Sequence, residues 1–319
     1  MSRVLLAGFG GLGAGQDHQR AMYLPAFHAH PGFTVAGAVG EAAGVDVPSY
    51  PDLPTALAAC DAEVVSVCLP PESRAEAIVT ALRAGRHVLA DKPMALTLAE
   101  TEAIAAAAEE SGTVCMPAHH QRFAPALRSA RAAVAAGRVG LPWNVQADFL
   151  VAGGEPCPLG ELTNFGVYPV DVVAALTGQP VRRVHARPGR GVTVLLLDHD
   201  HGLTSTISVG RVNEAAGVPP GGLALHRYRI SGSNGVMNVD AAKPFATVRT
   251  ATGVRAAWHG PGTVDRMLAE FHAAVTGGRR AEVGPADALA ALRVVEAARR
   301  SIETGAPVDL IQNPQEGGK

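Results

Sequence analysis

The sequence has 319 residues, is 47% hydrophobic and carries a formal net charge of −2 at pH 7. This length is enough for two domains of the usual ~100–200 residues, and the near-neutral charge gives no basic surface for nucleic acid. No apolar run approaches the ~18 residues of a membrane span. The N-terminus leads directly into an apolar run without the regions of a secretory signal, so we expect neither a nucleic acid nor a membrane as partner.

The first third of the sequence predicts strands that alternate with helices. The expected strands are residues 4–7, 33–39, 64–69, 87–90 and 114–116. The expected helices are residues 52–59, a segment that opens with a capping box from Ser73 to Glu76 and ends at Gly85, and residues 98–111, closed by Gly112. This alternation predicts an α/β fold with a parallel, doubly wound sheet.

A glycine motif follows the first strand. Residues 8–13 read "GFGGLG" and fit G-x-G-x-x-G, with Gly8, Gly10 and Gly13 at the glycine positions. Glycine allows a tight turn and a close approach of the backbone to a pyrophosphate. The motif by itself also fits an ordinary glycine-rich turn, but its place after the first strand of an alternating pattern favours a dinucleotide site.

The end of the second strand bears on the choice between NAD and NADP. NAD-binding sheets usually carry an acid there for the adenosine ribose, whereas this sequence has Gly40, with Glu41 one residue later. No arginine follows to favour a 2′-phosphate, so both cofactors stay open. Glu41 would repel a 2′-phosphate, which gives a slight preference for NAD.

A lysine stands at the end of a buried strand in "HVLADKPMALTLAE", residues 87–100. Because a residue before proline is driven away from helical geometry, Lys92 cannot begin the helix that Thr97 and Glu100 cap. We expect Lys92 at the carboxyl end of the strand, which is the edge where parallel sheets bind ligands. Taken alone, the lysine also fits an ordinary solvated surface residue.

The remainder of the sequence predicts a different kind of sheet. Residues 143–151 and 181–254 read as short, often alternating strands separated by glycine turns. "LDHDHG", residues 197–202, resembles a metal-binding cluster but lies between two strand-like runs, so we interpret it as a turn and predict no metal. The four cysteines show no CxxC spacing, which indicates free thiols in a reducing cytosol, and therefore a cytoplasmic protein.

Several segments, in order, resemble the family of glucose–fructose oxidoreductases, inositol dehydrogenases and their relatives (Gfo/Idh/MocA). They are "VVSVCLPPESRAEAIVTAL", where Arg74 stands near the usual histidine, "AGRHVLADKPMALTLAE", "MPAHHQRFAPAL", "NFGVYPVDVVAALTG", "RISGSNGVMNVD" and the closing helices. The resemblance implies a Rossmann domain over residues 1–118. It also implies a C-terminal domain over residues 119–319, with a large, mostly antiparallel sheet that binds substrate and forms a homodimer or homotetramer.

The resemblance also implies the reaction: NAD(P)-dependent interconversion of a hydroxyl and a carbonyl on a sugar, cyclitol or related polyol. The catalytic residues carried over are Lys92, Tyr168 and Asp171, with Tyr168 where histidine is usual. Tyrosine has an ordinary pKa of ~10, and a lysine cation nearby would lower it, so Lys92 and Tyr168 make a reasonable pair. Asp171 follows Tyr168 by three residues and shares its face of a helix.

The remaining predicted contacts are with cofactor and substrate. The cofactor set is Gly8, Phe9, Gly10, Leu12, Gly13, Gly40, Glu41, Leu69, Pro70, Asp91, Lys92 and His120; the substrate set is Lys92, Arg122, Asn164 and Tyr168.

Two features depart from the family pattern. The segment between Gly13 and Leu24 is longer than usual, so the first helix is expected to begin late, and Asn164 lies in a shortened stretch where aspartate is common. The alternatives are a nicotinamide-binding regulator without turnover, against which the retained Lys92 argues, an imine reductase, or an NAD-dependent hydrolase of the same family.

Overall fold

The computed structural model describes residues 1–9, 17–40, 44–215, 217–242, 246–250, 253–257 and 262–310. Contacts within the chain separate two compact units. The first contains Met1–His120, Cys157–Gly160 and Thr263–Leu292; the second contains Gln121–Pro156, Glu161–Gly262 and Arg293–Lys319. These units are discontinuous in sequence, and the domain limits of 1–118 and 119–319 stay a prediction.

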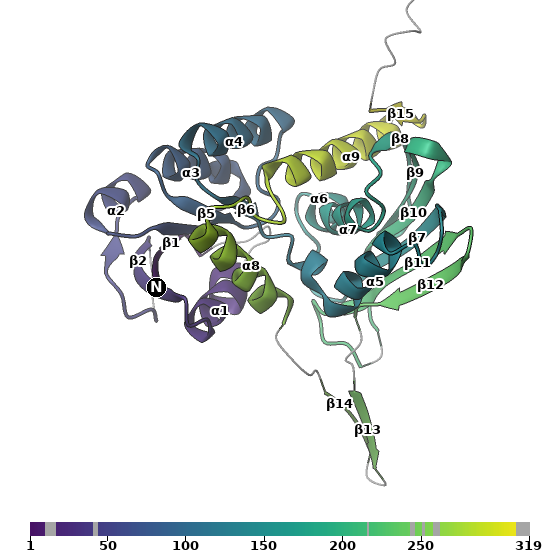
Figure 1. Ribbon diagram of the computed structural model, residues 1–319, viewed down its shortest axis with the longest axis horizontal. Helices are drawn as coiled ribbons and strands as arrows, with labels where there is room; N and C mark the ends of the chain where they lie inside the picture. The colour runs from purple at the N-terminus through teal and green to yellow at the C-terminus, as the bar shows by residue number, and fades with distance from the viewer. Residues whose placement is uncertain are drawn as a thin grey trace, which may run out of the picture. The chain divides into compact units, whose positions relative to one another are not determined.

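The first unit is built on a parallel sheet (Figure 1). Its six strands lie in the order β3-β2-β1-β4-β5-β6, and every neighbouring pair is parallel. The strands are β1 (Ser2–Ala7), β2 (Phe33–Val39), β3 (Ser49–Tyr50), β4 (Val64–Val67), β5 (His87–Ala90) and β6 (Cys115–Pro117). The predicted parallel sheet is confirmed, and the strand order reverses between β1 and β4, which is where doubly wound sheets bind dinucleotides.

The helices of this unit connect successive strands. They are α1 (Leu24–Ala29), α2 (Leu53–Ala59), α3 (Pro71–Arg83) and α4 (Leu98–Ser111). The predicted capping box of α4 is confirmed, since the Thr97 side chain accepts from Glu100 N and the Glu100 side chain accepts from Thr97 N. The core between sheet and helices consists of small and aliphatic side chains, among them Leu5, Val65 and Ile78.

The capping box predicted at Ser73 is wrong. Helix α3 begins at Pro71, with Pro70 as the N-cap residue and no side-chain cap. Proline fits the first helical turn because it has no N–H that needs a partner there. Ser73 therefore lies inside the helix, and its hydroxyl donates to the Pro70 carbonyl at 3.2 Å instead.

Within the described residues, the first helical segment after β1 lies directly before α1. A π-helical turn, η1 (Gln19–Tyr23), runs directly into α1. The Ser66 hydroxyl on β4 donates to Gln19 Oε1 at 3.1 Å. This bond fixes the start of the turn on the sheet.

A helix from far along the chain completes the first unit. Helix α8 (Thr263–Gly277) packs on α1. Phe271 of α8 stacks on Phe33 of β2 with ring centroids 6.2 Å apart. Helix α9 (Pro285–Thr304) then carries the chain from the first unit to the second.

The second unit is built on a larger, mixed sheet. Its order is β12-β11-β7-β10-β9-β8-β15. The β10–β7 pair is parallel and the other five neighbouring pairs are antiparallel, which confirms the predicted mostly antiparallel sheet. The strands are β7 (Pro142–Ala152), β8 (Val181–Pro188), β9 (Val192–His199), β10 (Thr204–Val212), β11 (Leu223–Gly232), β12 (Gly235–Asp240) and β15 (Val308–Asp309); β13 (Ala246–Thr250) and β14 (Gly253–Ala257) form a separate hairpin.

Helices cover one face of this sheet (Figure 1). They are α5 (Pro125–Ala135), α6 (Glu161–Phe165) and α7 (Val167–Thr177). Alternate strand residues such as Phe149, Ile207 and Ile230 are buried on the helix side. The intervening residues belong to the opposite face.

The turn "LDHDHG" connects β9 to β10, as predicted. A short 3-10 turn, η3 (Asp200–Gly202), lies between the two strands. His199 is buried, and its Nε2 lies 2.7 Å from the Ser205 hydroxyl. Throughout the described part of the chain, no group of three or more His, Cys, Asp or Glu side chains is arranged for a metal ion. No helix there has the length and apolarity needed to cross a membrane.

Candidate functional site

Lys92 stands where the sequence placed it, just beyond the end of a strand. Strand β5 ends at Ala90 and α4 begins at Leu98. The Lys92–Pro93 peptide bond is cis. Lys92 is only 4% exposed, so it is not the solvated surface lysine that the sequence alone also allowed. Burial of a flexible cationic side chain is costly and uncommon.

The residue before it, Asp91, is the centre of a buried polar network. The Tyr23 hydroxyl donates to Asp91 Oδ1 at 2.6 Å. His18 Nδ1 lies 3.0 Å from Asp91 Oδ2, and Arg74 Nη2 donates to the same oxygen at 3.2 Å. Both carboxylate oxygens are therefore occupied by donors from two different parts of the first unit.

Arg74 also binds the backbone on either side of the lysine. Its Nη1 donates to the Pro93 carbonyl at 2.6 Å and to the Asp91 carbonyl at 3.3 Å. Its Nε and Nη2 donate to the Leu69 carbonyl at 3.0 and 2.7 Å. Arg74 is fully buried, and its planar fork joins the turn after β4 to the turn after β5.

The charges around Asp91 keep it ionised. Burial alone would raise the pKa of its carboxyl. The charge of Arg74, the hydrogen bond from His18 and the charges of His18 and Lys92 all lower that pKa. Together they hold the pKa of Asp91 well below its ordinary value. The turn thus places a permanent carboxylate next to a buried ammonium.

The described part of the predicted cofactor site lies at the carboxyl ends of β1 and β2. Gly8 follows β1 with φ +85°, and a Cβ there would come within 2.6 Å of Leu69 Cδ2. Gly40 follows β2 with φ +84° and open space around it. The Arg20 guanidinium lies 4.2 Å from the centre of the Phe9 ring. Gly10, Leu12, Gly13 and Glu41 lie outside the described residues.

The turn after β4 contains two further predicted cofactor residues. Leu69 supplies the carbonyl that Arg74 binds, and Pro70 precedes α3. His120 begins the 3-10 turn after β6, and its Nδ1 lies 2.8 Å from the Thr263 hydroxyl at the start of α8. The structure therefore gives Leu69 and His120 structural partners within the first unit.

In the second unit, two predicted site residues bind each other. Arg122 Nε donates to Asp171 Oδ2 at 2.8 Å, and Arg122 Nη2 donates to Asp171 Oδ1. Both side chains are nearly inaccessible to solvent. This bidentate pair joins the 3-10 turn before α5 to α7 and fixes the orientation of the guanidinium and of the carboxylate. The helix predicted around Asp171 is confirmed as α7.

Tyr168 precedes Asp171 on the same helix and is 4% exposed. Its ring packs on Phe149 of β7 with centroids 5.5 Å apart. His226 of β11 meets the same Phe149 ring at 5.1 Å, edge to face. Phe149 thus fixes the plane of the tyrosine from the sheet side.

The sequence reasoning did not identify His226 or Tyr228, which lie on the buried face of β11. His226 Nε2 is 3.1 Å from the Tyr228 hydroxyl. Burial lowers the pKa of His226 to about 4, against a smaller opposing effect of Asp240. Burial, with the charge of Asp171, raises the pKa of Tyr228 well above its ordinary value. Both groups are therefore neutral near pH 7.

The sequence also did not identify Arg211 on β10. Its Nε donates to Glu161 Oε1 at 2.7 Å, and its Nη1 donates to the Gly153 carbonyl. Asn164, a predicted substrate residue, is buried on α6 and its Nδ2 lies 3.5 Å from Glu161 Oε2. Arg211 thus holds together the shortened stretch that contains Asn164.

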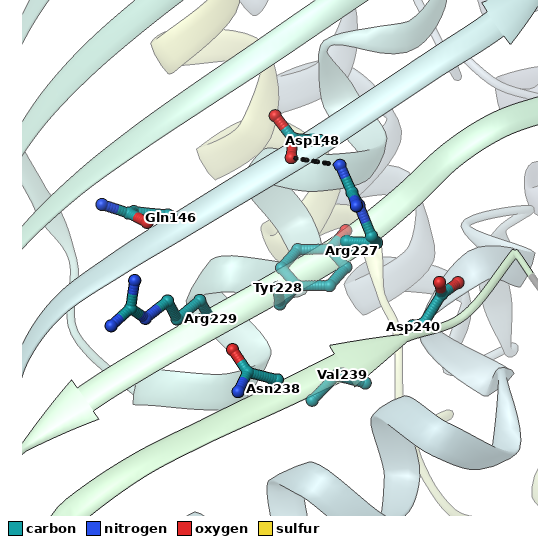
Figure 2. A pocket seen from close by; sticks show the side chains of 8 residues that line it. All are labelled: Gln146, Asp148, Arg227, Tyr228, Arg229, Asn238, Val239 and Asp240. Carbon is teal, nitrogen blue, oxygen red and sulfur yellow. Dashed lines mark hydrogen bonds and ion pairs between the residues drawn. The ribbon is translucent and has the colours of Figure 1, made fainter.

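A polar hollow lies on the sheet of the second unit (Figure 2). Its lining residues come from β7, β11 and β12: Gln146, Asp148, Arg227, Tyr228, Arg229, Asn238, Val239 and Asp240. Arg227 Nη2 donates to Asp148 Oδ2 at 3.4 Å. None of the predicted catalytic, cofactor or substrate residues lines it, so we do not assign the chemistry to this hollow.

The fold and the residues at the sheet edge define the class of protein. A parallel sheet in this strand order, with a positive-φ glycine directly after β1, is the arrangement that binds dinucleotides at the switch point. Residues 2–119 match the family model described as "Oxidoreductase family, NAD-binding Rossmann fold". Residues 2–119 are therefore similar to the NAD-binding domain of the Gfo/Idh/MocA oxidoreductases, the family that the sequence resembles.

Several proteins in the comparisons are named as sugar or cyclitol enzymes. The chain is 43% identical over 82 residues to 1,5-anhydro-D-fructose reductase of Ensifer adhaerens, covering 26% of this chain and 25% of that protein. It is 26% identical over 299 residues to D-xylose 1-dehydrogenase (NADP(+)) 2 of Haloferax volcanii, covering 86% and 88%. With several curated relatives, the match spans only a quarter to about half of the relative's own length.

Solved structures share the fold over nearly the whole chain. Scyllo-inositol dehydrogenase from Lactobacillus casei, with bound NAD(H) and scyllo-inositol, has a TM-score of 0.78 at 15% identity and covers 97% of this chain and 99% of that one. At this identity the likeness establishes the fold alone.

Proposed function

We propose that the protein is an NAD(P)-dependent dehydrogenase or reductase that interconverts a hydroxyl and a carbonyl group on a sugar, cyclitol or related polyol. The observation that carries the proposal is Lys92: a buried lysine held beyond the carboxyl end of β5 beside an ionised aspartate. A regulator that only binds nucleotide has no need of a buried ammonium at this edge.

The residues of the first unit fit a dinucleotide. The strand order brings the ends of β1 and β4 to the switch point, and Gly8 turns the chain there with a φ of +85° that side chains rarely adopt. At the end of β2, where the adenosine ribose would bind, no atom of the described residues lies within 4 Å of the place that a Cβ on Gly40 would take. When bound, the nicotinamide supplies the group that accepts or donates hydride.

The chain's own residues then handle the proton and the charge. Lys92 donates a hydrogen bond to the substrate oxygen and stabilises the negative charge that develops on it. Tyr168, on the second unit, is proposed as the group that gives a proton to the substrate during reduction and accepts one during oxidation. The pair with Arg122 holds both oxygens of Asp171 and helps to orient α7. The predicted catalytic role of Asp171 stays a proposal. Arg122 in turn has its fork directed at Asp171, so its predicted role as a direct substrate contact stays a proposal.

The substrate class rests on the comparisons. Relatives and structural neighbours are named for anhydrofructose, xylose and scyllo-inositol; all are small and rich in hydroxyl groups. The names of the relatives include both NAD and NADP. We propose NAD as the preferred cofactor because Glu41, next to Gly40 in the sequence, would repel a 2′-phosphate.

We further propose a homodimer or homotetramer through the second unit. On the sheet face opposite the helices, register aligns Val194, Ser208, Asp148, Arg227 and Asp240 in one row across five strands. Val194 is 41% exposed and its neighbour Leu196 is 47% exposed. This face therefore has exposed apolar side chains at one end and the charged pair of Asp148 and Arg227 towards the other. A second copy of the same surface could bury the apolar side chains and meet the charges. The four cysteines are buried and none forms a disulfide, which supports the proposal of a reducing, cytoplasmic location.

The experiment is a direct assay of turnover. Purified protein is mixed with NAD or NADP and a panel of aldoses, inositols and anhydroketoses, and reduced nicotinamide is followed by its near-ultraviolet absorbance. We expect net, substrate-dependent change with at least one polyol and a lower dissociation constant for NADH than for NADPH. Nucleotide binding without any net redox change across the panel would contradict the dehydrogenase and favour the regulator or the hydrolase.

A further inference from the structure

The chain uses lysine very sparingly. Lys92, Lys243 and Lys319 are its three lysines, against 24 arginines. Lys243 and Lys319 lie outside the described residues, so Lys92 is the single lysine in the part of the chain that the structure describes, and it is buried. Lysine places a compact ammonium at this position, where arginine would bring a larger, planar group.

The backbone of Lys92 is fixed on both sides. Asp91 N donates to the Val67 carbonyl at 2.9 Å, while Arg74 binds the carbonyls of Asp91 and Pro93. The side chain of Asp91 is fixed as well, by His18, Tyr23 and Arg74. The course of the Lys92 stem is thereby set by its neighbours.

Two of the groups that hold Asp91 come from the unusual segment of this chain. Tyr23 ends the π-helical turn and His18 immediately precedes it, within the stretch that is longer than in the family the sequence resembles. The long side chain of Arg74 reaches the short carboxylate of Asp91 from α3. His18 and Tyr23, from the segment before α1, contact the same carboxylate.

We propose that His18, Tyr23 and Arg74 are positioning residues for Lys92: they hold the Asp91 carboxylate and through it set the direction of the ammonium. This inference rests on the proposed function, because the position of the lysine matters for the chemistry assigned to it above. His18 and Tyr23 both contact Asp91, and the role proposed for them is to act on the lysine through that carboxylate.

The test uses the three lysines. Selective ¹³C labelling of the lysine ε-carbons in the full, nucleotide-free chain gives one signal for each lysine, and Lys92→Arg identifies the signal of Lys92. Tyr23→Phe removes one donor while keeping the buried ring. His18→Ala removes another at a side chain that is 17% exposed. His18→Asn retains an amide donor near the position of Nδ1.

We expect the Lys92 signal to shift in Tyr23→Phe and in His18→Ala and to return towards the wild-type position in His18→Asn. Tyr50→Phe is the matched control, because Tyr50 lies on β3, which three strands separate from β5; it should leave the signal in place. With substrate and cofactor, kcat of Tyr23→Phe should fall roughly tenfold, which corresponds to about 1.4 kcal/mol of barrier. The dissociation constant for the nucleotide should stay within about twofold, because this hydroxyl contributes to the transition state and not to binding.

The outcomes separate the two proposals. An unchanged Lys92 signal and unchanged kcat in both Tyr23→Phe and His18→Ala would overturn the positioning role, even if the protein is an active dehydrogenase. A shifted Lys92 signal in a protein that turns over no polyol would support the positioning and contradict the proposed function. Thermal unfolding of each variant shows whether the fold is kept, and if Tyr23→Phe does not fold, the two His18 variants decide.

Discussion

His226 should make the second unit sensitive to acid. The imidazole is fully buried, and its pKa is lowered from 6.5 to about 4, chiefly by burial. An unfolded chain binds a proton to this histidine below about pH 6.5, whereas the folded chain resists protonation until about pH 4. The unfolded state therefore binds more protons over this interval, and the free energy of unfolding falls as the pH is lowered through it.

The magnitude follows from the two pKa values. A difference of about 2.5 in pKa, at about 1.4 kcal/mol for each tenfold change in proton affinity, corresponds to roughly 3 kcal/mol. This contribution is fully present above about pH 6.5 and is lost by about pH 4. It is a large part of the typical ~5–15 kcal/mol stability of a domain.

The assay is urea unfolding at about pH 7 and about pH 4, followed by the fluorescence of tryptophan, to which Trp143 of β7 contributes. His226→Gln removes the titrating group and keeps a polar partner for Tyr228. Its pH-dependent loss of stability should be smaller than that of the wild type by about 2–3 kcal/mol. The control is His201→Asn, at an exposed position with φ +55° that asparagine tolerates. Equal pH dependence in the wild type and His226→Gln would refute the reasoning.

Three further predictions concern burial and assembly. Asp171→Asn breaks the buried bidentate pair with Arg122 and should lower the free energy of unfolding, measured by urea titration, by about 3–5 kcal/mol. Asp148→Asn, at the exposed pair with Arg227, should change it by less than about 1 kcal/mol. Similar losses in the two variants would contradict the assignment of one pair as buried and the other as exposed. All four cysteines are buried, and burial raises the pKa of Cys115 to about 12. A thiol reagent should therefore react only after denaturant is added. A thiol that reacts quickly in the native protein would contradict this prediction. Light scattering at micromolar concentration should give the mass of a dimer or tetramer, and a strictly monomeric mass would count against the proposed interface.

The local signals in the sequence placed the central lysine correctly. The strand at residues 87–90, the Thr97 cap and the end of α4 at Ser111 agree with the structure because each depends on neighbouring residues: an apolar run, a capping box and Gly112. The same type of signal failed at Ser73, since the helix already begins at Pro71, with Pro70 as its N-cap residue. When two local signals compete for the start of a helix, the sequence alone does not show which one is used, because the outcome depends on where the neighbouring strands end.

The polar network could not be derived from local patterns. Asp91 meets Tyr23 across 68 residues of sequence, and Arg122 meets Asp171 across 49. No periodicity connects such residues, because the sheet order that brings them together is decided by the packing of the whole unit. Arg74 offered one clue, since a charged residue in an otherwise apolar helix stretch needs a buried partner.

The account depends most directly on Lys92. Lys92→Met keeps the length of the stem and removes the charge, and should leave the fold and nucleotide binding nearly intact because the phosphates are assigned to the glycine turn after β1. Turnover of the substrate found in the panel should fall by about 10²–10³, as is typical when a positioned donor to a developing charge is lost. Tyr168→Phe should also lose rate, and the double variant should lose less than the product of the two if both groups act on one proton transfer. Near wild-type turnover by Lys92→Met, with the nucleotide bound as tightly as before, would contradict the mechanism.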